Sequence, residues 1–480
     1  MDKFAIIENF LALCAIPHKS HHEEQISRYL YDWAVGKGLQ AHRDEEGNVI
    51  IDKPASAGCE NAPTTILQAH MDMVVVWEEG KDFDPLKDAI TVIDSGDSLR
   101  AMGTSLGGDD GAGVAIAMTI LEDPDAVHGP IRAIFTVDEE DGMSGAENLD
   151  PRFASGDYLI NLDWEEFGSL CCSSAGSDMY RFRRVPEWTP VVDGVAFDVS
   201  VRGLTGGHSG SEIHMGRTNA IRTAAGMILA AAKAGADVRL VSFSGGSAHN
   251  AIPTNALATV VVPAEDAALF LSVADTEGMI RRSAALPTDP NAEITVTPLE
   301  ELPDMAASSE DTCAFFTALT SVHDGVHTMS PTIPGLVESS ASTGLASLSE
   351  EYMEFIVHQR SSEPAITRDM KAVFAQNAQD SGFTMETLSS GAPWPVRPDS
   401  HLVEICKKQF RAITGKDIRV EPVHAGLECG CLSQMNPGLD IISIGPDIHD
   451  IHTTRETLII ETVYQCDELV RGILKEIAGK

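Results

Sequence analysis

Three short apolar segments of this chain are each followed directly by a histidine or an acidic residue. This pattern constrains the fold more than any other feature. The segments cover residues 64–69, 131–137 and 157–162. Continuous apolar runs of this length are typical of fully buried strands. A glycine-rich turn and a helical segment at 111–123 separate the first two. Buried strands alternating with helices indicate an α/β domain with a largely parallel sheet.

The pattern changes near residue 186, where apolar and polar residues begin to alternate. Alternation at 194–204 predicts a strand with one wet face. We predict an α+β insertion of two related halves over 186–395, and one α/β domain over 1–185 and 396–480. The expected elements of the insertion are 218–235, 238–246, 258–265, 266–284 and 292–299, then 351–362, 366–382 and 383–391. The α/β domain resumes with a helix at 401–415, a strand at 439–446 and a closing helix at 457–478.

The balance of charge excludes several classes of partner. The chain has 72 acidic against 34 basic residues, a net charge of −38. Nucleic acid and anionic membrane surfaces both require clustered Lys and Arg, so neither is expected as a partner. No apolar run reaches the ~20 residues needed to cross a bilayer, and the first 20 residues lack the features of a signal peptide. Most of the acidic excess is expected to be a solvated surface.

The cysteines indicate a reducing compartment. There are nine, an odd number, at irregular spacing and without a C-x-x-C pair. This usage favours free thiols and a cytoplasmic location. Cys429 and Cys431 are better explained by core packing than by metal binding.

Histidine and acidic residues gather where the predicted strands end. His70 and Asp72 are two residues apart, so both can face one side. The other candidates are Asp109 and Asp110 in a glycine-rich turn, the run 138–140, Asp163, and His449 with His452. In open α/β sheets, functional groups collect at the carboxyl ends of the strands. Packing many carboxylates together is costly unless cations compensate. Imidazole with carboxylate suits zinc, with manganese or cobalt as alternatives, and two ions would share a carboxylate and a water.

Each of these motifs has an ordinary explanation when taken alone. A single H-x-D is more often a surface pair, an acidic run a solvated turn, and GGDDG a plain loop. HTTRE at 452–456 could simply begin a helix. The ordinary explanations account poorly for the joint occurrence of these motifs after successive apolar strands.

Together the motifs resemble the M20 metallopeptidase family, and within it the aminoacyl-histidine dipeptidase, or cytosol non-specific dipeptidase, branch. The resemblance covers nearly the whole chain and is carried by HMDMV, SLGGDDGAGVA, TVDEEDGMSGA, GLTGGHSG, HNAIPTNA and HAGLECG, which begin at residues 70, 105, 136, 203, 249 and 424. It implies a zinc-exopeptidase-like catalytic domain with a mixed, largely parallel sheet. It also implies an inserted lid domain of ferredoxin-like type, single or doubled, through which the chain would form a homodimer.

The resemblance implies a role for each residue of the metal site. The ligands would be His70, Asp109, Glu140, Asp163 and His452. Asp109 would bridge two divalent ions, His70 and Asp163 completing the first site and Glu140 and His452 the second. Asp72 would orient the His70 imidazole, and Glu139 would be the general base.

Other residues are implied in substrate binding. His208 would bind the substrate and stabilise the oxyanion, in some relatives from a neighbouring subunit. Asn250 and Arg360 are candidates for holding the substrate carboxylate, a task that suits the bidentate guanidinium. An exposed surface position explains Arg360 equally well. Glu428 is a fourth candidate for substrate binding.

Two positions depart from the family pattern. Asp110 stands where the resemblance predicts Asn, which adds a negative charge beside the metals. The last motif reads HTTRE, and His449 precedes His452 by three residues, so either imidazole could be the final ligand. The spacing of His452 to Glu456 favours His452.

The expected function is hydrolysis of dipeptides by a water that two metal ions activate, with Glu139 accepting its proton. The specificity could be broad or directed to Xaa-His dipeptides, including β-alanyl-histidine. The alternatives are an aminotripeptidase, an N-acyl amino acid deacylase, or a non-catalytic metal-binding scaffold. A dinuclear phosphatase is disfavoured because no Arg or Lys accompanies the acidic strand ends.

Overall fold

The computed structural model describes residues 4–331, 333 and 335–480 in two compact units. The first unit comprises 1–174, 394–423 and 427–480, and the second comprises 175–393 and 424–426. The division falls at 174/175 and 393/394, whereas we expected it at 185/186 and 395/396. The strand β9 (Gly176–Arg184) explains the first difference, because it pairs with β18 and β19 inside the sheet of the second unit.

An eight-stranded sheet forms the centre of the first unit, in the order β1-β2-β6-β3-β7-β21-β8-β20. The neighbours β6, β3, β7 and β21 run parallel, so their carboxyl ends share one edge. The mixed, largely parallel sheet predicted from the sequence is confirmed. Its strands are β1 (Gln40–Arg43), β2 (Val49–Lys53), β3 (Thr65–His70), β6 (Ile131–Thr136), β7 (Tyr158–Asn161), β8 (Ser169–Ser174), β20 (Arg419–Val423) and β21 (Asp440–Ser443).

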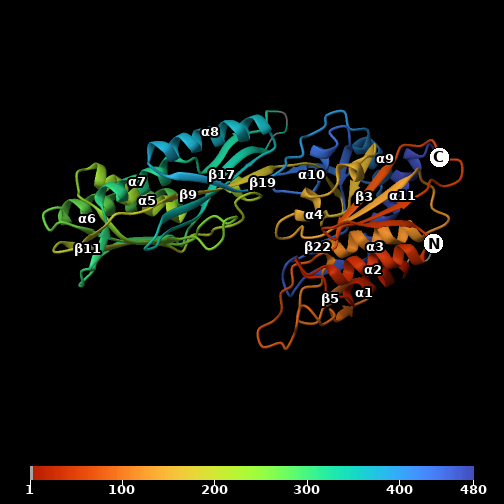
Figure 1. The fold of residues 1–480 in the computed structure, drawn as a ribbon, viewed down its shortest axis with the longest axis horizontal. Helices are drawn as coiled ribbons and strands as arrows, with labels where there is room; N and C mark the ends of the chain where they lie inside the picture. The colour runs from red at the N-terminus through yellow and green to blue at the C-terminus, as the bar shows by residue number, and fades with distance from the viewer. Residues whose placement is uncertain (1–3, 332, 334) are drawn as a thin grey trace. The chain divides into compact units, whose positions relative to one another are not determined.

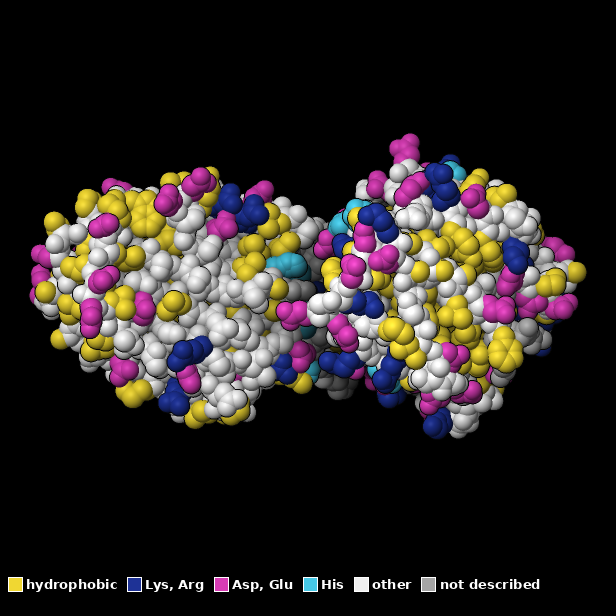
Figure 2. All heavy atoms as spheres, turned by 90° about the horizontal axis from the view of Figure 1, so that it is seen from below, with side chains coloured by type: hydrophobic (Ala, Val, Ile, Leu, Met, Phe, Trp, Pro, Cys, Tyr) yellow, Lys and Arg dark blue, Asp and Glu magenta, His cyan; other side chains and the backbone are white. Residues whose placement is uncertain are grey.

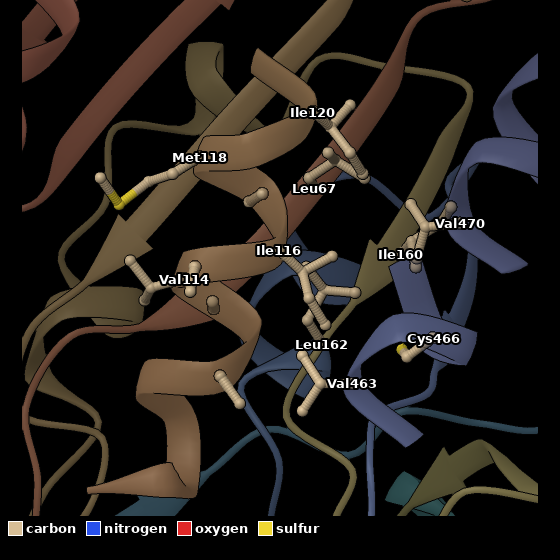
Figure 3. Close-up of a cluster of buried hydrophobic side chains, with 14 of the residues drawn as sticks. Leu67, Val114, Ile116, Met118, Ile120, Ile160, Leu162, Val463, Cys466 and Val470 are labelled. Carbon is tan, nitrogen blue, oxygen red and sulfur yellow. The ribbon is translucent and has the colours of Figure 1, made fainter. Parts of the chain in front are cut away.

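Helices cover both faces of this sheet. One face packs against α1 (Phe4–Cys14), α2 (Glu24–Gly36), α3 (Gly108–Glu122), α9 (His401–Thr414) and α11 (Ile460–Ile477). The other packs against α4 (Ser144–Glu147), η1 (Pro151–Ala154) and α10 (Cys429–Met435). Figure 3 shows apolar side chains of α3, among them Ile116 and Ile120, beside Leu67 of β3, with Ile160 of β7 next to Val470 of α11. The sheet, α1 and α11 surround α3, so this helix has no polar face. Its first turn lies beside the end of β3, where Asp109 contacts His70.

The first unit also contains a small four-stranded sheet, in the order β22-β23-β5-β4. Its strands are β4 (Val92–Asp94), β5 (Ser98–Ala101), β22 (Ile448–His449) and β23 (Thr457–Ile459). The antiparallel pair of β22 and β23 holds the loop that contains His452.

The second unit contains a nine-stranded sheet in the order β14-β11-β13-β12-β17-β18-β9-β19, with β16 also pairing β17. Its strands are β9, β11 (Val195–Arg202), β12 (Arg239–Gly245), β13 (Ala256–Val262), β14 (Glu293–Pro298), β16 (Gly325–Met329), β17 (Val337–Leu348), β18 (Met353–Ser361) and β19 (Thr384–Gly391). The helices are α5 (Ala220–Lys233), α6 (Ala267–Ala285), α7 (Ser309–Ser321) and α8 (Pro364–Asp380), together with η2 (Ile213–Met215). A separate pair joins β10 (Trp188–Pro190) to β15 (Met305–Ala307).

Two ferredoxin-like halves make up this sheet, so the doubled form of the insertion is confirmed. One half is β11-α5-β12-β13-α6-β14 and the other is β9-α7-β17-β18-α8-β19. Each is a βαββαβ unit with its strands in the spatial order 4-1-3-2. The halves join where β12 pairs with β17, and their helices pack against the sheet (Figure 1). The first half is nested between β9 and α7 of the second, which the sequence pattern did not predict.

The surface agrees with the composition. Acidic side chains are scattered among basic and uncharged ones over the face seen in Figure 2, as expected for a solvated acidic surface. Among the described residues, no helix is long and apolar enough to cross a membrane.

Candidate metal centre

The end of β3 places the His70 imidazole in the middle of an acidic cluster. His70 is buried, and its Nε2 lies 3.0 Å from Asp109 Oδ1 and 3.6 Å from Asp163 Oδ1. Its Nδ1 lies 3.0 Å from the Asp72 carbonyl oxygen and 3.4 Å from Asp72 Oδ1. One ring nitrogen therefore faces two carboxylates while Asp72 fixes the other.

The Asp109 carboxylate joins a second cluster on its other side. Asp109 Oδ2 lies 3.1 Å from His452 Nε2, and the same nitrogen lies 2.9 Å from Glu140 Oε1. His70, Asp109 and Glu140 each offer a ligand atom within 4.8 Å of the other two. The two oxygens of Asp109 thus point to two different histidines, which is the arrangement required of a carboxylate shared by two ions.

The cluster requires positive charge. Burial raises the pKa of the Asp163 carboxyl well above its usual range, and Asp109 nearby adds to the shift. Burial opposes protonation of His452, but hydrogen bonds with Asp109 and Glu140 outweigh it and raise its pKa to about 10. Divalent cations bound to these atoms would compensate the charge of the acids. The residues present therefore fit a pair of divalent ions.

Asp72 connects the first histidine to the predicted base. Its Oδ1 accepts the Glu139 N–H at 3.0 Å and its Oδ2 accepts the Ser20 hydroxyl at 2.8 Å. The Glu139 residue follows Asp138, whose φ of +57° turns the chain sharply at the end of β6. Burial and the surrounding charges raise the pKa of Glu139 well above its usual range. A carboxylate with a raised pKa is suited to accept and return a proton near neutral pH.

The structure brings His452, and not His449, to the cluster. His449 is exposed and pairs with Thr457 in the small sheet. His452 lies beyond the strand, in a loop where its own φ is +58°. This backbone turn directs its side chain toward Asp109.

Asp110 is held by backbone hydrogen bonds beside His70. It is buried, its Oδ2 accepts the His70 N–H at 3.3 Å, and its Oδ1 accepts the Gly113 N–H at 3.1 Å. Burial and the neighbouring Asp109 raise its pKa well above the usual range. The negative charge that Asp110 was expected to add beside the metals stays a prediction.

Glu428 lies beneath the strand ends. Its carboxyl is fully buried, and Oε2 accepts hydrogen bonds from Gln68 Nε2 at 2.5 Å and Thr136 Oγ1 at 2.7 Å. It offers no exposed atom to a substrate in this structure, and its expected role in substrate binding remains a prediction.

The sequence analysis did not assign a role to two further acids at the centre. Burial, followed by the charge of Asp109, raises the pKa of Glu165 to about 7. Glu165 follows Asp163 by two residues, and this spacing was the available signal. The second acid is Glu456, which served above only through its spacing to His452. It contacts the loop that precedes Asp109 directly.

The second unit assembles the other predicted residues around Gly210. A Cβ at Gly210 would lie 2.9 Å from both Arg360 Nε and His208 Cε1, so the two side chains flank this glycine. The Ser209 N–H donates to the Asn250 carbonyl at 2.8 Å, which ties the two predicted loops together. His208, Asn250 and Arg360 therefore lie in one neighbourhood.

Arg360 is a buried cation without an anion. Its side chain is 6% exposed, and its Nε has no hydrogen-bond partner among the described residues. No described acidic side chain forms an ion pair with it. Its neighbours are imidazoles: burial, followed by the Arg360 charge, lowers the pKa of His358 to about 2 and of His424 to about 3. A buried guanidinium without an anionic partner destabilises the folded state. An anion bound beside Arg360 would remove this penalty. The exposed surface position considered for Arg360 is wrong.

Known proteins are similar to this chain over nearly its whole length. Residues 66–476 match the peptidase family M20/M25/M40. The chain is 33% identical to the cytosol non-specific dipeptidase of Escherichia coli (strain K12), over 98% of this chain and 97% of that protein. It superposes on the crystal structure of aminoacylhistidine dipeptidase from Vibrio alginolyticus with a TM-score of 0.89 and 31% identity, over 98% and 96% of the two chains. A tripeptidase from Staphylococcus aureus shares the fold, with a TM-score of 0.57 and 16% identity over the full length of both chains.

Proposed function

The chain belongs to peptidase family M20/M25/M40, and on that premise we propose that it is a dipeptidase that uses two divalent metal ions. The observation that carries the metal pair is the Asp109 carboxylate, whose oxygens face His70 on one side and His452 on the other. The full-length relatives described as dipeptidases support the substrate class.

Five residues would hold the ions, namely His70, Asp109, Glu140, Asp163 and His452. Nitrogen and oxygen ligands in this combination favour zinc, with manganese and cobalt as alternatives. When bound, such ions supply Lewis acidity and make a nucleophilic water available near neutral pH. Asp72 fixes the His70 ring for this task.

Glu139 acts as the general base. Its raised pKa lets it take the proton of the attacking water and return it to the leaving amine. The N–H that it donates to Asp72 fixes the backbone at this residue.

Arg360, His208 and Asn250 bind the substrate. The unpaired Arg360 guanidinium would donate hydrogen bonds to the carboxylate of the dipeptide, whereas a longer peptide would carry its carboxylate farther from the bond that is cleaved. Burial lowers the pKa of His208, as does Arg360, so its imidazole is neutral at pH 7. A neutral ring can donate one hydrogen bond to an oxyanion. This role requires the tautomer that carries the proton on Nε2, because Nδ1 accepts the N–H of Ser211.

We also propose a homodimer that forms through the second unit. Leu269, Met279 and Ile280 of α6, and Leu286 just after it, are exposed apolar residues, with Met279 60% and Ile280 58% exposed. The neighbouring β14 is an edge strand of the nine-stranded sheet. Light scattering should give twice the chain mass, and Ile280→Glu should give the monomer. The nine free cysteines and the cytosolic relative support a cytoplasmic location.

A panel of substrates tests the activity. Purified protein loaded with zinc should hydrolyse dipeptides, with and without a carboxy-terminal histidine, faster than tripeptides or N-acyl amino acids, and a chelator should abolish this activity. Preference for tripeptides or N-acyl substrates would support the alternative peptidase or deacylase. Tight metal binding without any hydrolysis would support the scaffold.

A further inference from the structure

A single carboxylate, that of Glu456, binds the backbone of the loop that precedes Asp109. Its Oε2 accepts the N–H groups of Leu106 at 2.7 Å and Gly107 at 3.1 Å. Its Oε1 accepts those of Gly108 at 2.7 Å and Asp109 at 3.4 Å. Glu456 is 3% exposed. Four consecutive peptide groups therefore converge on one buried side chain.

The loop is shaped to receive this carboxylate. Gly107 has a φ of +77°, which directs its N–H inward. A Cβ at Gly108 would lie 3.2 Å from Glu456 Oε1 and 3.3 Å from Ile448 Cγ2, so the carboxylate approaches the bare backbone. Gly108 of the GGDDG motif is thus explained by the acid that it contacts, 348 residues away in sequence. At Gly107, a Cβ would instead lie 2.9 Å from Met73 Sδ.

Glu456 also anchors the loop of the other histidine. It lies four residues after His452, and its N–H donates to the Thr453 carbonyl at 3.2 Å. His452 and Asp450 both have positive φ, +58° and +53°. Non-glycine residues keep such conformations only where surrounding contacts fix them. The Glu456 N–H holds Thr453 at the end of this loop, and the Thr453 hydroxyl donates to the Asp450 carbonyl at 2.7 Å.

No described cation pairs with Glu456, so peptide groups alone stabilise it. Converging N–H groups form an anion-binding concavity, and hydrogen bonds to a charged acceptor are stronger than neutral ones. Metal ligands must be held within about 0.5 Å of the productive geometry. A contact that joins two ligand loops directly fixes the separation of their side chains.

We propose that Glu456 is a positioning residue that holds Asp109 and His452 at the spacing required by the second metal ion. This inference rests on the proposed two-metal function. Asp109 and His452 are both proposed ligands of the second ion, whereas only Asp109 is also a proposed ligand of the first ion. Loss of Glu456 should therefore weaken the second ion more than the first.

The test is a zinc titration of the metal-free full-length protein in chelator buffers. Glu456→Gln replaces one oxygen by an amide NH₂, which cannot accept from the two N–H groups that it faces. We expect the second equivalent of zinc to bind 10–100-fold more weakly, the range typical of residues that support metal ligands, with a smaller change for the first. The cobalt-loaded variant should show an altered visible spectrum. Glu461→Gln, at an exposed position on α11, should bind both ions as the wild type does.

Two further variants separate positioning from general destabilisation. Ser105→Ala removes buried hydrogen bonds to Val74 and Val76 beside the same loop without contacting Glu456, and should leave both affinities unchanged. Gly108→Ala presses a methyl group against the carboxylate and should reproduce the selective loss if Glu456→Gln does not fold. Wild-type zinc affinities in Glu456→Gln, or an equal loss in Ser105→Ala, would overturn the inference. A wild-type protein that binds zinc but hydrolyses no dipeptide would instead count against the proposed function.

Discussion

Asp72 Oδ1 contacts two functional residues at once: it lies 3.4 Å from His70 Nδ1 and accepts the N–H of Glu139 at 3.0 Å. One buried oxygen therefore bonds the backbone of the predicted base and faces the ring of a predicted ligand, which the Asp72 carbonyl also contacts at 3.0 Å. Binding of the first ion and proton transfer should depend on the same carboxylate.

Replacing Asp72 tests this connection. Asp72→Asn keeps the shape but weakens the acceptor, so we expect zinc affinity to fall about 10–100-fold and turnover to fall further at saturating zinc. Competition with a chromophoric chelator measures the zinc affinity, and initial rates at saturating zinc measure the turnover. Ser20→Ala removes only the hydroxyl that donates to Oδ2 and should change neither by more than a few fold. An Asp72→Asn enzyme with wild-type affinity and rate would contradict the relationship.

Glu139→Gln should separate catalysis from metal binding. Glu139 is not a proposed ligand, so metal content measured by elemental analysis should remain two per chain. General acid–base groups contribute about 10²–10⁴-fold, and turnover should fall by at least that factor. Glu147→Gln, on an exposed position of α4, is the matched control. Full activity in Glu139→Gln would refute the assignment of the base.

Arg360→Met should affect substrate binding without loss of stability. Because the guanidinium has no acidic partner among the described residues, its removal relieves a buried charge, and the thermal unfolding temperature should hold or rise. The KM for dipeptides should rise about 10–100-fold, the loss of a charge-assisted pair, while metal content is unchanged. Arg368→Met, at an exposed position, should leave KM unchanged. A strong loss of stability in Arg360→Met would indicate a structural role instead.

The metal-free protein should lose stability as the pH rises. The pKa of His452 is raised to about 10, against a usual value of 6.5, because Asp109 and Glu140 outweigh the effect of burial. The charged pairs thus stabilise the folded state fully below pH 6.5 and are lost as the pH rises through about 10. Per proton, the free energy of unfolding changes by at most about 1.4 kcal/mol for each pH unit.

Urea unfolding of the metal-free protein between pH 6.5 and 9.5 measures how steeply the free energy of unfolding falls with pH. His452→Gln should reduce this slope, whereas His449→Gln, at the exposed neighbouring histidine, should not. Zinc should bind more tightly as the pH rises, because each bound imidazole must release its proton. Equal slopes in wild type and His452→Gln would contradict the assigned pairs.

The sequence alone determined the elements with strong periodicity and the chemistry at the strand ends. The runs that end at His70 and before Asp163 were apolar enough to be strands in any context, and their carboxyl ends meet because parallel strands share an edge. The helix of α3 and the two-domain division were readable for the same reason. What the sequence did not reveal was β17, whose Ser, Ala and Gly residues resemble a loop and become a strand only by pairing with β18.

Tertiary structure decided everything that depends on burial and long-range contact. It selected His452 over His449, buried Asp110 beside His70, nested one half of the second unit inside the other, and turned Glu456 from a spacing marker into a contact with the Asp109 loop. A sequence pattern records which groups are present, and local periodicity places them on elements. Whether a carboxyl is charged, or which of two histidines reaches an acid, depends on atoms that the fold brings from distant segments.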